Sequence, residues 1–83
     1  MKVIRTTAIF KCVVTFKNGT HKILRMTIDL VAKMTYQFRQ CQKSIFRNEF
    51  ILMYIGDDFL NLTDIKQAKF INERTSEEYL TLA

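Results

Sequence analysis

The chain has 83 residues and a formal net charge of +5, with 48% hydrophobic residues, 25% charged residues and no proline. This composition and length exclude a disordered tail and predict one small folded domain, residues 1–83, with a modest core. No apolar stretch is long enough to span a bilayer, and the apolar run after Arg5 is interrupted by Lys11 before a signal-peptide core can form. We therefore expect a cytoplasmic protein that is not embedded in a membrane.

The first part of the chain predicts a β-hairpin. From residue 4 to Phe16 the even positions are mostly apolar and the odd positions mostly polar, which is typical of a half-buried strand. Asn18-Gly19 follows, and this pair favours a two-residue type I′ turn, in which both central residues need positive φ. Such a loop pairs Phe16 with His21 and Cys12 with Arg25, and it places the returning strand at residues 21–26.

A helix is expected directly after the hairpin, from Ile28 to about Gln40. Thr27 suits the N-cap and Asp29 suits the positive end of the helix dipole. Four apolar residues then recur at helical spacing and predict the buried face: Val31, Met34, Phe38 and Cys41. The polar stretch 42–48 that follows is compatible with a loop or with a short strand.

The second half predicts four more strands. The continuous apolar run 50–55 favours a central strand covered on both faces, and the turn 56–58 leads to a strand over 59–62. Thr63 and Asp64 are expected to cap a short helical turn that ends at Lys66. Strands over 68–72 and 77–82 complete the chain, with Tyr79 expected to face away from Leu80 and Leu82. The predicted fold is a single α+β domain with the element order ββαββββ.

The sequence offers little for catalysis. His21 is the only histidine, Cys12 and Cys41 are the only cysteines, and two glycines cannot form a phosphate loop. Three acidic residues with a nearby lysine are weakly similar to the metal site of a nuclease, but turn and cap roles explain them better: Asp57, Asp58, Asp64 and Lys66. We therefore expect neither an enzyme nor a metal site nor a cofactor.

The charge is distributed unevenly along the chain. Residues 1–48 contain ten Lys and Arg against one acid, a net charge of +9, whereas residues 49–83 contain three bases against seven acids, a net charge of −4. A concentrated basic surface attracts polyanions or acidic proteins. The candidate contact residues lie on the hairpin, at the end of the helix and in the stretch after it: Lys11, Lys22, Arg25, Arg39, Lys43 and Arg47.

Aromatic residues are interleaved with this second basic group. Tyr36, Phe38 and Phe46 stand near the basic residues around the helix end, and stacking residues beside cations suit single-stranded nucleic acid. Phe38, however, fits the apolar face of the helix. A solvated basic surface above a buried aromatic core is the competing interpretation of the same pattern.

The run from Asp58 to Lys66, continued by Lys69-Phe70-Ile71-Asn72, resembles the strand, short turn and strand near the ends of small accessory proteins of Gram-positive bacteriophages and mobile elements. The resemblance covers about the last third of the chain and transfers no functional residue. It implies a non-enzymatic accessory or inhibitory protein that binds a host or phage machine. Inhibitors that mimic DNA are strongly acidic, and the basic character of this chain departs from them.

Two functions are thus compatible with the sequence. In the first, a small binding module uses its basic surface to contact nucleic acid or a nucleoprotein complex. In the second, a protein-interaction or inhibitor module uses the same charges to bind an acidic protein partner or a neighbouring copy in a homo-oligomer. The steep dependence of nucleic-acid binding on salt distinguishes the first from the second.

Overall fold

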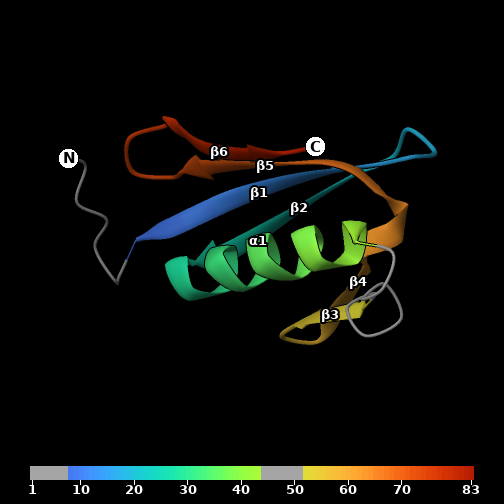
Figure 1. The fold of residues 1–83 in the computed structure, drawn as a ribbon. Coiled ribbons are helices and arrows are strands. Elements are labelled where there is room, and N and C mark those ends of the chain that lie inside the picture. Colours follow the sequence, from blue (N-terminus) through green and yellow to red (C-terminus); the bar gives the residue numbers. More distant parts are fainter. Residues whose placement is uncertain (1–7, 44–51) are drawn as a thin grey trace.

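The computed structural model describes residues 8–43 and 52–83, and it confirms an α+β domain with the predicted element order (Figure 1). Predictions for residues 1–7 and 44–51, including the start of the first strand and the end of the polar stretch 42–48, lie outside the described residues. The elements are β1 (Ile9–Phe16), β2 (His21–Thr27), α1 (Ile28–Gln42), β3 (Leu52–Ile55), β4 (Asp58–Asn61), the 3₁₀ helix η2 (Leu62–Asp64), β5 (Ile65–Asn72) and β6 (Glu78–Leu82).

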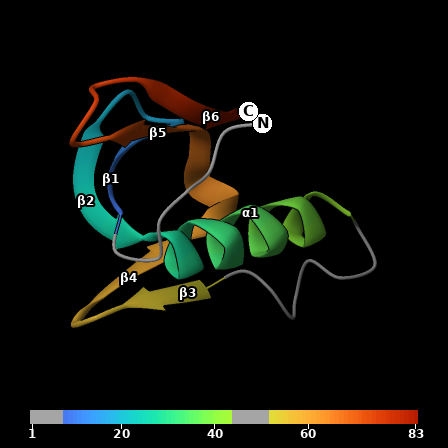
Figure 2. The same ribbon diagram turned by 90° about the vertical axis from the view of Figure 1, so that its left-hand side faces the viewer.

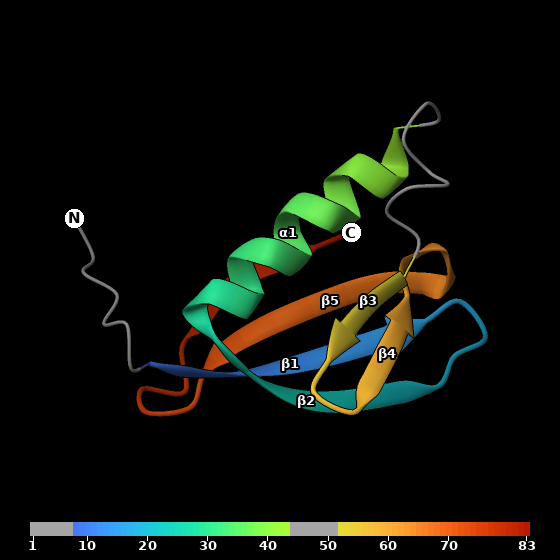
Figure 3. The same cartoon turned by 90° about the horizontal axis from the view of Figure 1, so that it is seen from below.

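The elements form two layers. An antiparallel four-stranded sheet has the order β2-β1-β5-β6, and a separate two-stranded sheet joins β3 to β4. Helix α1 and the β3–β4 hairpin lie on the same face of the larger sheet, which curves over them (Figures 2 and 3). The opposite face is covered by no element in the described part of the chain (Figure 2). A single layer of cover is usual for an antiparallel sheet with alternating apolar and polar positions.

The hairpin forms, but its predicted register and turn are wrong by one residue. Cys12 pairs with Leu24 instead of Arg25, and Thr15 instead of Phe16 pairs with His21. The loop contains three residues, because Phe16 N–H donates to the carbonyl of Thr20 (2.9 Å) and only Gly19 has a positive φ, +90°. This geometry is that of a turn followed by a left-handed bulge residue.

Burial explains the observed register. A shift by one residue moves every side chain of a strand to the other face of the sheet. The predicted register would place Arg25 opposite the buried Cys12, whereas the observed register places Leu24 there and brings Met26 opposite Phe10. The apolar pattern of β2 thus outweighed the type I′ preference of Asn-Gly, and His21 stands exposed with Nδ1 at 3.2 Å from Thr15 Oγ1.

Helix α1 is formed as the sequence predicts and extends two residues beyond the expected end. The Thr27 hydroxyl accepts a hydrogen bond from the amide of Leu30 (3.4 Å), which satisfies one of the unpaired donors of the first turn. The predicted apolar face is buried in full: Val31, Met34, Phe38 and Cys41. This face anchors the helix on the sheet and leaves its flanks available for other contacts.

The prediction of a central strand over 50–55 is wrong for its described part. Within the described residues β3 pairs only with β4, so it is not a central strand, and its burial alternates along the strand, so only one of its faces is covered. Met53 is buried, but its neighbours Leu52 and Tyr54 are 44% and 66% exposed. The continuous apolar run therefore predicts the strand correctly but predicts too much burial for it. A short apolar run has no alternation from which the number of covered faces of a strand can be inferred.

The turn between β4 and β5 begins earlier than predicted. The side chain of Asn61 caps η2 by accepting from the amide of Thr63 (3.0 Å), in the role expected of Thr63 and Asp64. The turn ends at Asp64 instead of Lys66, and β5 begins at Ile65. Asn commonly bonds to the backbone two residues ahead in this way, and the earlier cap lengthens the central strand.

The core is one cluster shared by the sheet, the helix and the hairpin. Its largest fully buried side chains are Phe10 and Phe70 on the two central strands. Cys12, which pairs with Phe70, is likewise fully buried. Burial raises the pKa of the Cys12 thiol from 9.0 to about 12, because the thiolate would lose its hydration. Cys12 is therefore a neutral core residue at physiological pH.

The Cys12 thiol should make the fold weaker in alkali. Between pH 9 and 12 the unfolded chain loses the thiol proton while the folded chain keeps it, so the free energy of unfolding should fall by up to about 1.4 kcal/mol per pH unit. Urea unfolding of the wild type and of Cys12→Ala at pH 7 and at about pH 10.5 measures the effect. The wild type should lose more stability than the variant; equal losses would contradict the assignment.

Candidate functional site

The structure does not bring the sequence-predicted basic residues together on one surface. Lys11 and Arg25 are directly opposite each other on β1 and β2, on the uncovered face of the sheet. Lys22 pairs with the buried Val14 and so faces the other side, where its Nζ lies 3.3 Å from Asp58 Oδ1. The hairpin residues thus belong to two faces.

Acidic residues of the second half neutralise part of this basic surface. Arg25 donates to both carboxylate oxygens of Glu73, at 3.0 and 2.9 Å, and this hydrogen-bonded pair raises the pKa of the Arg25 guanidinium. The pair of Lys22 with Asp58 likewise joins the two halves of the sequence. The +9 and −4 halves of the sequence therefore meet within the domain, at exposed ion pairs of small energetic value.

Arg39 and Lys43 form a separate cationic site at the C-terminal end of α1. Arg39 lies in the last turn and Lys43 is the C-cap, so both charges also suit the negative end of the helix dipole. Neither makes an ion pair within residues 8–43 and 52–83. Arg47, the sixth predicted contact residue, lies outside the described residues.

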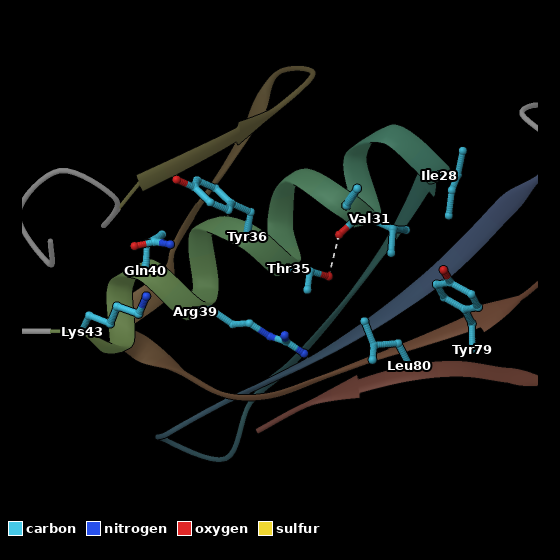
Figure 4. Close-up of a pocket in the computed structure, with 10 residues that line it drawn as sticks. Ile28, Val31, Thr35, Tyr36, Arg39, Gln40, Lys43, Tyr79 and Leu80 are labelled. Carbon is cyan, nitrogen blue, oxygen red and sulfur yellow. Dashed lines mark hydrogen bonds between the residues drawn. The ribbon is translucent and has the colours of Figure 1, made fainter.

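A groove of about 480 Å³ runs along α1, between the helix and strand β6. Its apolar part consists of Ile28, Val31 and Ala32 from the helix and Tyr79 and Leu80 from the strand. Figure 4 shows the rings and methyl groups of Tyr79 and Leu80 directed from β6 toward the helix. An apolar groove with a few polar groups at one end is the usual form of a ligand site.

The cationic site lies at one end of this groove. Arg39, Gln40 and Lys43 line it together with Tyr36. In Figure 4 the Arg39 side chain extends from the helix toward the strands, whereas Lys43 and Tyr36 point away from them. The Thr35 hydroxyl is not available to a ligand as a donor, because it donates to the carbonyl of Val31 (2.8 Å). Arg39 is therefore the polar group best placed to orient a ligand in the groove.

A β-bulge in β6 contributes Tyr79 to the groove, against the prediction that it faces away from Leu80. Phe70 pairs with Leu80 and the next residue of β5, Ile71, pairs with Glu78, so Tyr79 is the extra residue. Its ring centroid lies 5.1 Å from that of Phe10. Strict alternation along the sequence cannot reveal such a bulge, and the groove was missed because its two walls are far apart in the chain.

A second exposed apolar surface lies on the β3–β4 hairpin. Tyr54 and Phe59 are paired across the two strands with ring centroids 6.1 Å apart, and Leu52 stands beside them. The sequence does not predict this surface, because the apolar run 50–55 is typical of a strand that is buried on both faces. This surface lies on two short strands of four residues each.

The acidic residues considered as a possible metal site lie in turns and in an ion pair. Asp57 lies in the β3–β4 turn, Asp58 forms the ion pair with Lys22, and Asp64 ends η2 and accepts from the amide of Lys17 through its carbonyl (2.8 Å). The described residues contain no group of three or more His, Cys, Asp and Glu side chains that could hold a metal ion. No helix in the described ranges is both long and apolar enough to cross a membrane.

Comparisons of the chain with protein-family models, with curated proteins and with solved structures found no match. The resemblance of residues 58–72 to accessory proteins of phages and mobile elements stays a prediction.

Proposed function

We propose that this domain is a small non-enzymatic binding module that holds an extended segment of a protein partner in the groove between α1 and β6. The observation that carries the proposal is the position of this apolar groove beside the outermost strand of the larger sheet, with Arg39 at one end. A segment lying there contacts apolar side chains of both walls, and the cation fixes its orientation. A cytoplasmic location accords with this role.

A protein segment fits the groove better than a nucleic acid does. A nucleic-acid strand carries a phosphate at every nucleotide and is bound by many cations, whereas Arg39 and Lys43 are the only cations among the described residues that line the groove. The hairpin cations are paired or face elsewhere: Lys22 with Asp58, and Arg25 with Glu73. Single-stranded nucleic acid, suggested by Tyr36 and Tyr79 beside these cations, is the alternative that the experiment must exclude.

Blocking the groove tests the proposal. Ala32 lines the groove and is exposed, so Ala32→Trp places a large ring in it without disturbing the core. Lys33→Trp is the matched control, because Lys33 is the next exposed helix residue and does not line the groove. Peptides selected against the wild type from a displayed random library should lose about tenfold or more of their affinity for Ala32→Trp and little for Lys33→Trp.

The results of this experiment distinguish a protein segment from a nucleic acid as the partner. Circular dichroism should show that both variants keep the fold. Selected peptides that bind both variants equally well would place the binding site elsewhere and reject the groove. A labelled single-stranded oligonucleotide that binds the wild type, with a steep dependence on salt, and loses affinity on Ala32→Trp would replace the protein segment with nucleic acid.

A further inference from the structure

Strand β6 has an edge that no other strand of the described chain occupies. It is the last strand in the sheet order β2-β1-β5-β6 (Figure 1). An edge of this kind presents unpaired N–H and C=O groups to which another chain can pair. Among the described strands only β6 lines the groove, through Tyr79 and Leu80, so the groove lies at the side of the sheet that this edge bounds.

The hydrogen-bond pattern identifies which groups of β6 point outward. Asn72 N–H donates to Glu77 O (2.9 Å) and Glu73 N–H to Ile9 O (3.1 Å), so even-numbered residues of β5 bond toward β6 and odd-numbered ones toward β1. The partners of the even residues Phe70 and Ala68 are Leu80 and Leu82, whose backbone groups are therefore used within the sheet. The N–H and C=O of Thr81, between them, point to the open edge.

Charge indicates the chemistry of the occupant. Arg39 extends into the space between α1 and the strands, and it makes no ion pair with any described residue. The apolar walls lie toward the start of the helix and the cations toward its end. An occupant complementary to this groove has apolar side chains along most of its inner face and a carboxylate at one end.

We propose that the partner segment binds by adding a strand to β6, with alternate apolar side chains in the groove and an acidic side chain at Arg39. This inference rests on the proposed function and specifies the partner: an extended acidic and apolar segment. An added strand continues the sheet about 4.8 Å beyond β6, so its inner-face side chains lie on the side of the sheet where Leu80 lines the groove with α1. Main-chain bonds supply affinity, and the groove and Arg39 supply specificity.

Defined peptides test this binding mode. The probes are acetylated Val-Thr-Val-Thr-Glu amide and its reverse, Glu-Thr-Val-Thr-Val, each with a version that carries Lys in place of Glu. One of the two acidic orders should bind, and its identity gives the direction of the added strand. The Lys version should bind about tenfold more weakly or worse, since it loses the charge-assisted hydrogen bond to Arg39 and places a like charge beside it.

N-methylation of single peptide amides then tests the main-chain pairing. In an added strand only every second residue bonds to β6, so methylation should lower affinity about tenfold at alternate positions and little between them. On the protein, amide exchange of Thr81 should slow by about tenfold or more when the peptide is bound, whereas that of Leu80 and Leu82 should change little. Ala32→Trp should weaken the binding of the same peptide.

The outcomes distinguish the binding mode from the function. Suppose that Ala32→Trp weakens peptide binding, but that N-methylation has no alternating effect and the amide exchange of Thr81 is unchanged. This result would overturn strand addition and would still support the groove as the binding site. If neither acidic peptide binds while library-selected peptides do, the proposal that the partner segment is acidic would be overturned. Protection of Thr81 in the absence of peptide, rising with protein concentration, would show that a second copy of the chain occupies the edge instead.

Discussion

Phe70→Ala should lower the free energy of unfolding by about 3–5 kcal/mol, a large part of the stability expected of a domain of this size. Phe70 lies on the central strand β5 and is fully buried, and it pairs with Cys12 on one side and Leu80 on the other. Its removal leaves a cavity in the core beside Cys12 and Leu80 on the neighbouring strands. Urea unfolding monitored by circular dichroism gives the change.

Phe59→Ala is the matched control for this prediction. The same substitution on β4 removes a ring that is 59% exposed and loses mainly its contact with Tyr54, so the cost should stay below about 1 kcal/mol. If Phe70→Ala is unfolded before urea is added, Phe70→Leu provides a measurable intermediate. Similar costs for Phe70→Ala and Phe59→Ala would contradict the assignment of the core.

Reversing the charge of the helix end should have the largest effect on binding. Arg39→Glu combined with Lys43→Glu should lower the affinity for the acidic peptide about a hundredfold at low salt, because two attractive charges become repulsive at one end of the groove. Lys22→Glu combined with Arg25→Glu changes the net charge by the same amount on other parts of the surface. Titration calorimetry or fluorescence anisotropy across a salt series measures both.

The double variant of Lys22 and Arg25 shows whether binding depends on the charges at the groove or on the whole basic surface. If the groove is the site, reversal of Lys22 and Arg25 should change affinity only through long-range attraction, and this change should vanish as salt is raised. If the whole basic surface is the site, the two double variants should weaken binding equally. Arg25→Glu also faces Glu73, so unfolding of each variant must be measured alongside.

The sequence predicts the elements of this fold better than their registers and burial. Thr27 and the apolar spacing of α1 determine the helix through local interactions, and the structure confirms them. The hairpin register was wrong because a local turn preference competed with burial of Leu24, which depends on the rest of the sheet. Similarly, the exposure of Tyr54 depends on what covers each face of β3, and this is a property of the tertiary structure.

The candidate site was less accessible to sequence reasoning than the fold. Arg39 and Lys43 were selected by charge, and the structure places both on the groove. Lys11, Lys22 and Arg25 were selected by the same criterion and lie elsewhere, because charge along a sequence does not specify the face of the sheet. The apolar walls combine Val31 of the helix with the bulged end of β6, and only the fold brings them together.

The most direct test of the groove as the binding site is the map of backbone amide shift changes when a selected peptide is titrated into the labelled domain. Changes should be concentrated in Val31, Thr35 and Arg39 on the helix and in residues 79–82 on β6. Ile23 and Lys11 on the uncovered face of the sheet should remain unchanged. Shift changes that are concentrated on that face, with none along α1 and β6, would contradict the account.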